Sequence, residues 1–280
     1  MAKNKIKLSK ISLYHYIKLV FHSLMFVAVL VLYIINRTHG LADLFEMFDY
    51  TQIVLMCMWM VFAIEMIFRF FPSKIESMGC QKIFKRNFVP YEDNSQKKPK
   101  NSSALSTFAV ASAWLALNLA IGILYFVNVF DDGILILISI AYSVCDMICI
   151  LFFCPFQTWF MKNKCCNTCR IYNWDYAMIV TPLVFIPNWF TYTLVALALI
   201  LLIKWEIFYK IHPERFASNM NQNLRCANCQ EKLCQHKKQL QGFLKKCKAF
   251  YEEKLLTIPS KLIKPKPESK EKNNNEKTTD

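Results

Sequence analysis

The sequence predicts an all-α, polytopic membrane protein, with about six transmembrane segments bundled together and both termini in the cytosol. The chain has 280 residues, of which 55% are hydrophobic, and a mean hydropathy of +0.24, too apolar for an ordinary soluble domain. Its apolar residues form long blocks, close to the ~20 residues that a spanning helix needs and too long for barrel strands. Its net charge of +14 is concentrated in certain connections, which the positive-inside rule places in the cytosol.

The first two helices are expected within residues 11–71, after a basic N-terminal segment at 1–10. The apolar run at 19–35 extends back to Ile11 if the Lys18 side chain reaches the interface. No small-residue cleavage pattern follows it, which indicates a retained membrane anchor rather than a signal peptide. The second helix, at about 50–71, carries Glu65 and Arg69, whose spacing allows them to pair on one face.

The third and fourth helices are expected within residues 105–161, after a basic cytosolic loop at 72–104. Residues 105–130 contain no charged side chain, and the apolar run at 134–161 contains one, Asp146. Counted from residue 134, Asp146 lies roughly 18 Å deep, near the bilayer centre. A charge at that depth usually faces a partner or a wet cavity.

Residues 176–211 decide the topology. A single helix through the uncharged stretch 176–203 would be too long for a bilayer and would contain Pro182 and Pro187. A hairpin turning at 186–188 instead yields a short or re-entrant fifth segment and a full sixth helix from Trp189 to about Ile211. We expect the hairpin, because it keeps the following basic residues on the cytosolic side.

The tail divides into residues 212–258, with a cysteine cluster and a basic amphipathic helix, and a disordered end at 259–280. We expect the amphipathic helix to lie on the bilayer and bind anionic lipid, with a membrane or cytosolic protein as the alternative partner. Basic flanks of membrane spans account for the charge, so no nucleic acid is expected. The expected location is a membrane, crossed several times, and the cell membrane if the source is bacterial.

Two cysteine clusters predict a metal site. A C-x-x-C pair occurs in the cytosolic loop 162–175 and another in the tail, and cytosolic pairs of this kind indicate metal or redox chemistry. Two thiolates at this spacing can turn toward one ion. The predicted site holds zinc or an iron–sulfur cluster between the four residues Cys166, Cys169, Cys226 and Cys229. Substitute ligands are Cys165, Cys234 and His236, and the tail alone could supply the set Cys226, Cys229, Cys234 and His236. The flanking bases that would favour the thiolate form are Lys164, Arg170 and Arg225.

Intramembrane charges are the other candidate functional residues, namely Glu65, Arg69, Asp146 and Lys204. Glu65 and Lys204 lie at similar depth, so we expect them to form an ion pair between helices, with Arg69 as the alternative partner.

Two functions are compatible with these features. The first is a transporter or assembly factor whose Cys-ligated metal, structural zinc or an iron–sulfur cluster, closes the cytosolic side of the bundle. The second is a membrane oxidoreductase that passes electrons from an iron–sulfur or dithiol centre to a quinone-like acceptor. None of the Walker A, G-x-G-x-x-G, H-E-x-x-H and G-x-S-x-G motifs occurs, so both enzymatic and non-enzymatic functions remain open at this stage.

Overall fold

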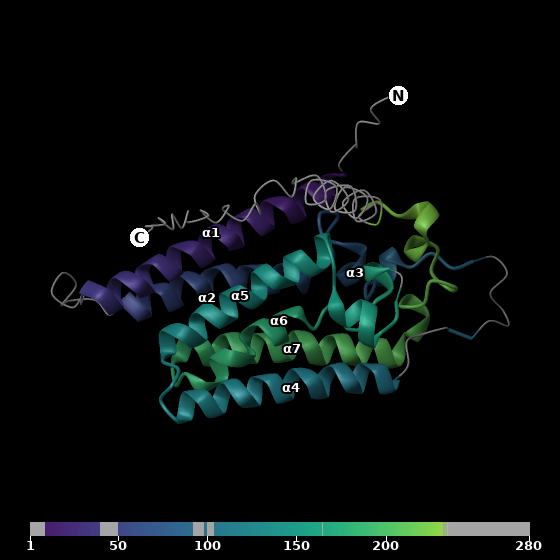
Figure 1. Cartoon of the computed structure of the whole chain (residues 1–280). Helices are drawn as coiled ribbons and strands as arrows, with labels where there is room; N and C mark the ends of the chain where they lie inside the picture. The colour runs from purple at the N-terminus through teal and green to yellow at the C-terminus, as the bar shows by residue number, and fades with distance from the viewer. Residues whose placement is uncertain are drawn as a thin grey trace, which may run out of the picture. The chain divides into compact units, whose positions relative to one another are not determined.

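The computed structural model describes residues 9–39, 50–91, 98–99, 104–163, 165–231 and 234, and within these ranges it contains helices and no β-strand (Figure 1). The all-α prediction is therefore confirmed. The long helices are α1 Lys10–His39, α2 Tyr50–Arg69, α4 Ala104–Phe126, α5 Asp132–Leu151 and α7 Trp189–Ile211. Two shorter helices, α3 Met78–Gln81 and α6 Asp175–Val180, lie in the connections. The amphipathic helix predicted at 230–256 falls outside the described residues, apart from 230, 231 and 234.

Among the described residues, four helices are long and apolar enough to cross a membrane, with spans at Lys10–Arg37, Gln52–Arg69, Ala104–Phe126 and Asp132–Leu151. Their outer faces carry large apolar side chains, such as Leu24 on α1 and Leu115 on α4, which are 64% and 63% exposed. Water would disfavour so large an apolar surface, whereas hydrocarbon accommodates it.

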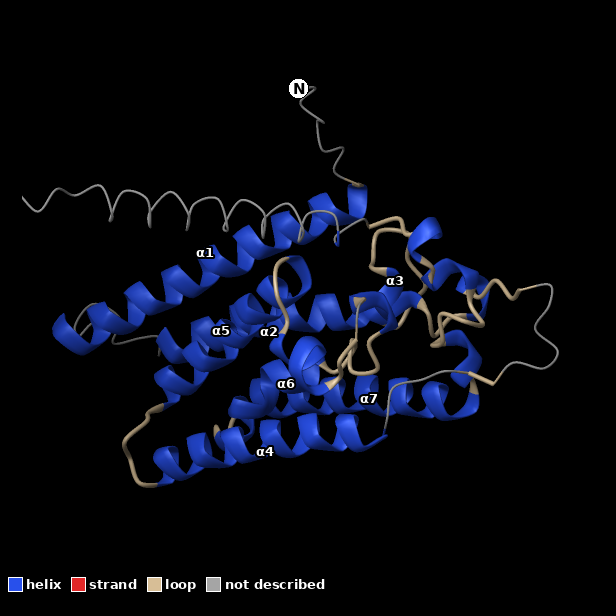
Figure 2. Ribbon diagram, turned by 45° about the vertical axis from the view of Figure 1, so that its right-hand side comes forward, coloured by secondary structure: helices blue, strands red, loops and turns tan. Residues whose placement is uncertain are grey.

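The core is built around the short segment α6 and the 3₁₀ turn η5 (Thr181–Phe185) that continues it. These residues pack against α5 and α7, while α1 packs against α5 and α2 against α7. Both views place α4 alongside α7 on the opposite side of the bundle from α1 (Figures 1 and 2). Fully buried side chains from several elements meet here, among them Phe62, Ile140, Leu183 and Leu201.

The break between the short segment and α7 occurs at residues 186–188. Pro182 lies in the first turn of η5, where its missing N–H costs no hydrogen bond, and the side chain of Asn188 accepts the Phe190 N–H at the start of α7. The apolar helical stretch Asp175–Phe185 would measure roughly 16 Å even as a regular α-helix, about half of the ~30 Å hydrocarbon core. It is therefore a short segment packed inside protein rather than a full span.

The fourth predicted helix is shorter than the sequence indicated. We expected it to reach residue 161, but α5 ends at Leu151 and a separate π-helical turn, η3, covers Phe156–Phe160. Pro155 accounts for the interruption, because its ring removes an N–H donor and collides with the preceding helical turn.

Candidate functional site

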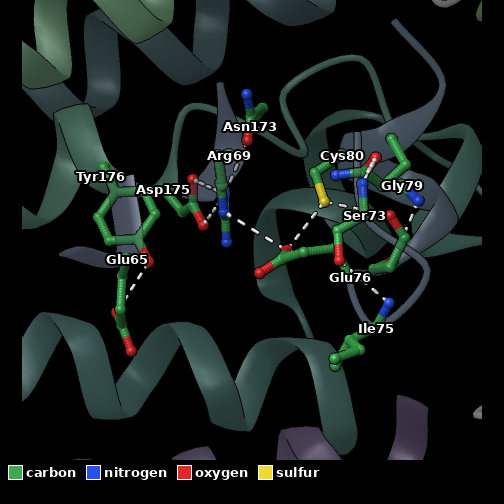
Figure 3. Close-up of polar contacts among 12 residues, drawn as sticks. Glu65, Arg69, Ser73, Ile75, Glu76, Gly79, Cys80, Asn173, Asp175 and Tyr176 are labelled. Carbon is green, nitrogen blue, oxygen red and sulfur yellow. Dashed lines mark hydrogen bonds and ion pairs between the residues drawn. The ribbon is translucent and has the colours of Figure 1, made fainter. Parts of the chain in front are cut away.

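A cluster of charged side chains inside the bundle centres on Glu65 of α2. Lys18 Nζ lies 2.9 Å from Glu65 Oε2, and His22 Nε2 lies 3.1 Å from Glu65 Oε1, both from α1. The Tyr176 hydroxyl, from α6, donates to Glu65 Oε2 at 2.8 Å (Figure 3). The predicted pair of Glu65 with Lys204 is wrong, because Lys18 is buried and supplies the cation instead of reaching the interface. Lys204 Nζ donates to the Phe70 carbonyl at 3.0 Å.

Arg69 occupies the next position along this cluster. Its Nη1 lies 2.6 Å from Asp175 Oδ2 and donates to Asn173 Oδ1 at 2.7 Å, and its Nε lies 3.9 Å from Glu76 Oε2 (Figure 3). The guanidinium also covers the Tyr176 ring at 4.5 Å. Glu65 and Arg69 therefore contact the hydroxyl and the ring of one tyrosine, and the structure shows no ion pair between them. A buried guanidinium needs such partners to offset its desolvation cost.

A second polar grouping surrounds a cavity of about 120 Å³ between α4, α5, α6 and the loop after α5. The walls are mainly apolar and aromatic, including Trp114, Tyr142, Phe156 and Met178. An apolar protein cavity of about 150 Å³ holds one benzene molecule, so the space suits a single planar ring. The polar lining includes five thiols and two carboxyl groups, from the residues Cys145, Cys149, Cys154, Cys166, Cys169, Asp146 and Asp175.

Two of these thiols contact each other because of the way α5 ends. The Phe153 N–H donates to the Ile148 carbonyl, five residues back, at 3.2 Å, so the chain makes a wide turn there. Cys154 has the same five-residue spacing from Cys149, and the two thiols form a hydrogen bond. The Gln157 N–H donates to Cys154 Sγ at 3.4 Å, a contact that favours the thiolate form of that cysteine.

Cys166 belongs to the same environment through Gln157, whose side-chain oxygen accepts from Cys166 Sγ at 2.9 Å. The turn at 166–169 is held by Lys82, whose Nζ donates to the carbonyls of Asn167 and Cys169 at 2.8 and 2.9 Å. Burial lowers the pKa of Lys82 to about 8 and raises the pKa of Cys169 to about 11. Cys169 is therefore a neutral thiol at ordinary pH when no ligand is bound.

Asp146 also lines this cavity, and it lies five residues before the end of α5 rather than near the middle of a longer helix. Its Oδ2 atom is buried and has no hydrogen-bond partner among the described residues. Asp175 lines the same cavity and connects it to Arg69. The cavity and the charge cluster are thus neighbouring sites that share one carboxyl group.

The four predicted metal ligands lie in two separate turns. Cys166 begins the 3₁₀ turn η4 (Cys166–Thr168) and Cys169 follows it, and Cys226 and Cys229 hold the same places at a similar turn, η8 (Cys226–Asn228). Within the described part of the chain, no three His, Cys, Asp or Glu side chains are grouped as a metal ion requires, and His236 lies outside that part. The metal site stays a prediction.

The tail nevertheless returns to the loop. The thiols of Cys165 and Cys234, both named as substitute ligands, form a hydrogen bond. Buried Glu231 accepts hydrogen bonds from Ser77 Oγ, the Met78 N–H and Asn167 Nδ2 at 2.8, 2.9 and 3.0 Å, so it anchors the start of the tail. Of the bases expected beside the thiolates, Arg170 binds Glu206, Arg225 covers the Tyr91 ring, and Lys164 lies outside the described residues.

Comparisons with protein-family models, with curated proteins and with solved structures find no match for this chain.

Proposed function

We propose that the chain is a multi-pass membrane oxidoreductase whose dithiol, Cys149 and Cys154, reduces a quinone-like ring bound in the cavity. The observation that carries the proposal is the pair of contacting thiols in the wall of an apolar space the size of one ring. Part of the proposal is the six-segment topology with both termini in the cytosol, supported by the distribution of basic residues and by the short segment α6–η5.

A single reduction of the quinone balances between the dithiol and the ring, and a thiol reductant must then return the disulfide to the dithiol before a second turnover. The two thiols each lose one proton and one electron as a disulfide forms between them, and the quinone gains two electrons and two protons to become a hydroquinone. Cys154 is the attacking thiolate, since its sulfur accepts the Gln157 N–H, and it forms a bond to the ring. Cys149 then attacks the Cys154 sulfur, and that bond to the ring breaks in favour of the disulfide.

The two carboxyl groups have different roles in this scheme. Asp146 has one oxygen at the cavity with no hydrogen-bond partner within the described part of the chain, and this carboxyl group can move protons between thiols and ring oxygens. Asp175 is held by Arg69 and keeps α6 in position beside the ring. The charges Glu65, Arg69 and Lys18 are positioning residues, since they hold Tyr176 and Asp175 in the bundle.

The test is turnover of a short-chain quinone by the reduced protein in lipid nanodiscs. The wild type should lose two free thiols for each hydroquinone formed, and a Cys149–Cys154 disulfide should be found by mass spectrometry. Cys149→Ser and Cys154→Ser should each abolish disulfide formation between these positions. Cys57→Ser is the matched control, because this thiol is exposed on α2 and does not line the cavity. Unchanged hydroquinone formation by the double serine variant would reject the proposal.

A second candidate function keeps the predicted metal. The contact between Cys165 and Cys234, together with the anchored Glu231, supports a Cys-ligated zinc ion or iron–sulfur cluster shared by loop and tail. The protein would then be a transporter or assembly factor whose metal closes the cytosolic end of the bundle. Metal analysis distinguishes the arrangements, because Cys166→Ser with Cys169→Ser should remove a shared ion and spare one held by the tail alone. A chromophore that bleaches on reduction would identify the cluster rather than zinc.

A further inference from the structure

We propose that the adjoining ends of α4 and α7 form a binding site for the headgroup of a zwitterionic phospholipid, with one phosphate and one primary ammonium. This inference is independent of the proposed oxidoreductase activity. A cavity of about 350 Å³ lies between residues 104–111 of α4, the last turns of α7 and the loop at 170–174. Its volume falls within the range of ~300–1,000 Å³ that is typical of small-molecule sites.

The position of this cavity is that of a lipid headgroup. On α4, the apolar side chains Leu105 and Phe108 are 77% and 70% exposed, and Phe108 lines the cavity itself. These residues stand at the beginning of a candidate membrane span, Ala104–Phe126. The cavity therefore opens where the apolar outer surface of the bundle starts, beside the polar loops of that end, and Trp174 and Tyr209 supply the aromatic side chains common at such boundaries.

The charges in the cavity select the class of headgroup. Both terminal nitrogens of Arg170 bind the Glu206 carboxylate, and the guanidinium lies 3.6 Å from the centre of the Tyr209 ring. Trp174 Nε1 donates to Glu206 Oε1 at 2.8 Å. A cation and an anion thus stand side by side in one pocket, and 37% of the Glu206 side chain remains exposed.

A ligand that complements this pair carries adjacent opposite charges of its own. A phosphate can bind Arg170 while a primary ammonium donates hydrogen bonds to Glu206. An anionic glycerol headgroup would bring hydroxyl donors to the Glu206 carboxylate but no positive charge to offset it. A quaternary ammonium has no N–H to donate, and the face of Tyr209 that could receive it is occupied by Arg170. Ethanolamine phospholipid fits, and glycerol and choline phospholipids fit less well.

The alternative role of Arg170 and Glu206 is to tie the loop to α7 without any lipid. Native mass spectrometry of the full chain distinguishes lipid binding from this purely structural role. The lipids compared are ethanolamine, choline and glycerol phospholipids with identical acyl chains. We expect the ethanolamine lipid to be retained about tenfold more tightly than the other two. Equal retention of all three by the wild type would overturn the inference.

Two variants and one control locate the site. Glu206→Gln should remove the preference for ethanolamine over glycerol headgroups, because it leaves only the cation. Ala111→Phe keeps both charges and fills the cavity from α4, so it should reduce retention of the ethanolamine lipid and provides the answer if Glu206→Gln does not fold. Glu214→Gln is the control, since Glu214 pairs with His212 and does not line this cavity. A preference that survives both Glu206→Gln and Ala111→Phe would also overturn the inference.

Discussion

Replacement of Glu65 by glutamine should destabilise the folded bundle through the cation it leaves behind. Lys18 and Glu65 lie 2.9 Å apart, with side chains 8% and 16% exposed. Glutamine can still accept a hydrogen bond from the Tyr176 hydroxyl, but it cannot neutralise the positive charge of Lys18. Loss of one partner from a buried ion pair costs about 3–5 kcal/mol. Because glutamine retains the hydrogen bond, we expect the lower end, about 3 kcal/mol, which is more than a hundredfold in the unfolding equilibrium.

A double-mutant cycle isolates the interaction. Lys18→Met removes the cation and keeps a side chain of similar length, so the double variant contains no unpaired charge at this position. It should be about 2 kcal/mol more stable than the sum of the single effects predicts, within the range known for contacting residues. Unfolding free energies can be measured by denaturant titration in bicelles.

The control cycle uses Lys204, which lies at a similar depth and donates to the Phe70 carbonyl. Lys204→Met and Glu65→Gln should be additive to within about 0.5 kcal/mol, as for residues without contact. Additive effects of Lys18→Met and Glu65→Gln would refute the Lys18–Glu65 ion pair. Coupling between Lys204→Met and Glu65→Gln would instead support the Glu65–Lys204 pair that was expected from their depth.

Three further predictions concern the loops at the end of the bundle. The pKa of Lys82 is about 8 in the folded protein, against 10.5 for a free lysine. Between these two pH values the unfolded chain binds more protons than the folded chain. The free energy of unfolding should therefore rise with pH across that window. Denaturation midpoints at the two ends of the window should show this rise in the wild type and lack it in Lys82→Met. With a pKa of about 11, Cys169 has a thiolate fraction of roughly one in a thousand at pH 8, so iodoacetamide should modify it far more slowly than exposed Cys226, as peptide mapping would show. Gly79→Ala should lower stability by about 1–3 kcal/mol, because the new Cβ would lie 2.6 Å from the Tyr172 ring, and Tyr172→Leu should recover part of the loss in thermal unfolding.

Helix positions could be predicted from the sequence because they depend on local chemistry. Uncharged stretches and proline positions carry the required information, and Pro187 and Asn188 lie at the break where α7 begins. The end of α5 was misplaced even though its signal, Pro155, was visible in the sequence. An apolar run continues across this proline, so composition alone extended the helix.

Partners between helices could not be predicted in the same way. Depth along a helix follows from residue counting, but the direction of a side chain around the helix depends on which neighbours pack there. Glu65 and Lys204 match in depth, yet Glu65 faces α1 and Lys204 faces the Phe70 carbonyl. The contact of Cys149 with Cys154 was not predicted for a related reason. Side chains five residues apart come together here only because the chain makes a wide turn after α5.

The short segment α6–η5 also constrains the order in which the molecule assembles. At roughly half the thickness of the hydrocarbon core, it is too short to insert across a bilayer as an independent helix. It must enter a space already formed by α5 and α7, and it brings Tyr176 and Asp175 to Glu65 and Arg69 as it does so. The Arg69–Asp175 pair should therefore form late in assembly, whereas the Lys18–Glu65 pair between α1 and α2 does not depend on the short segment.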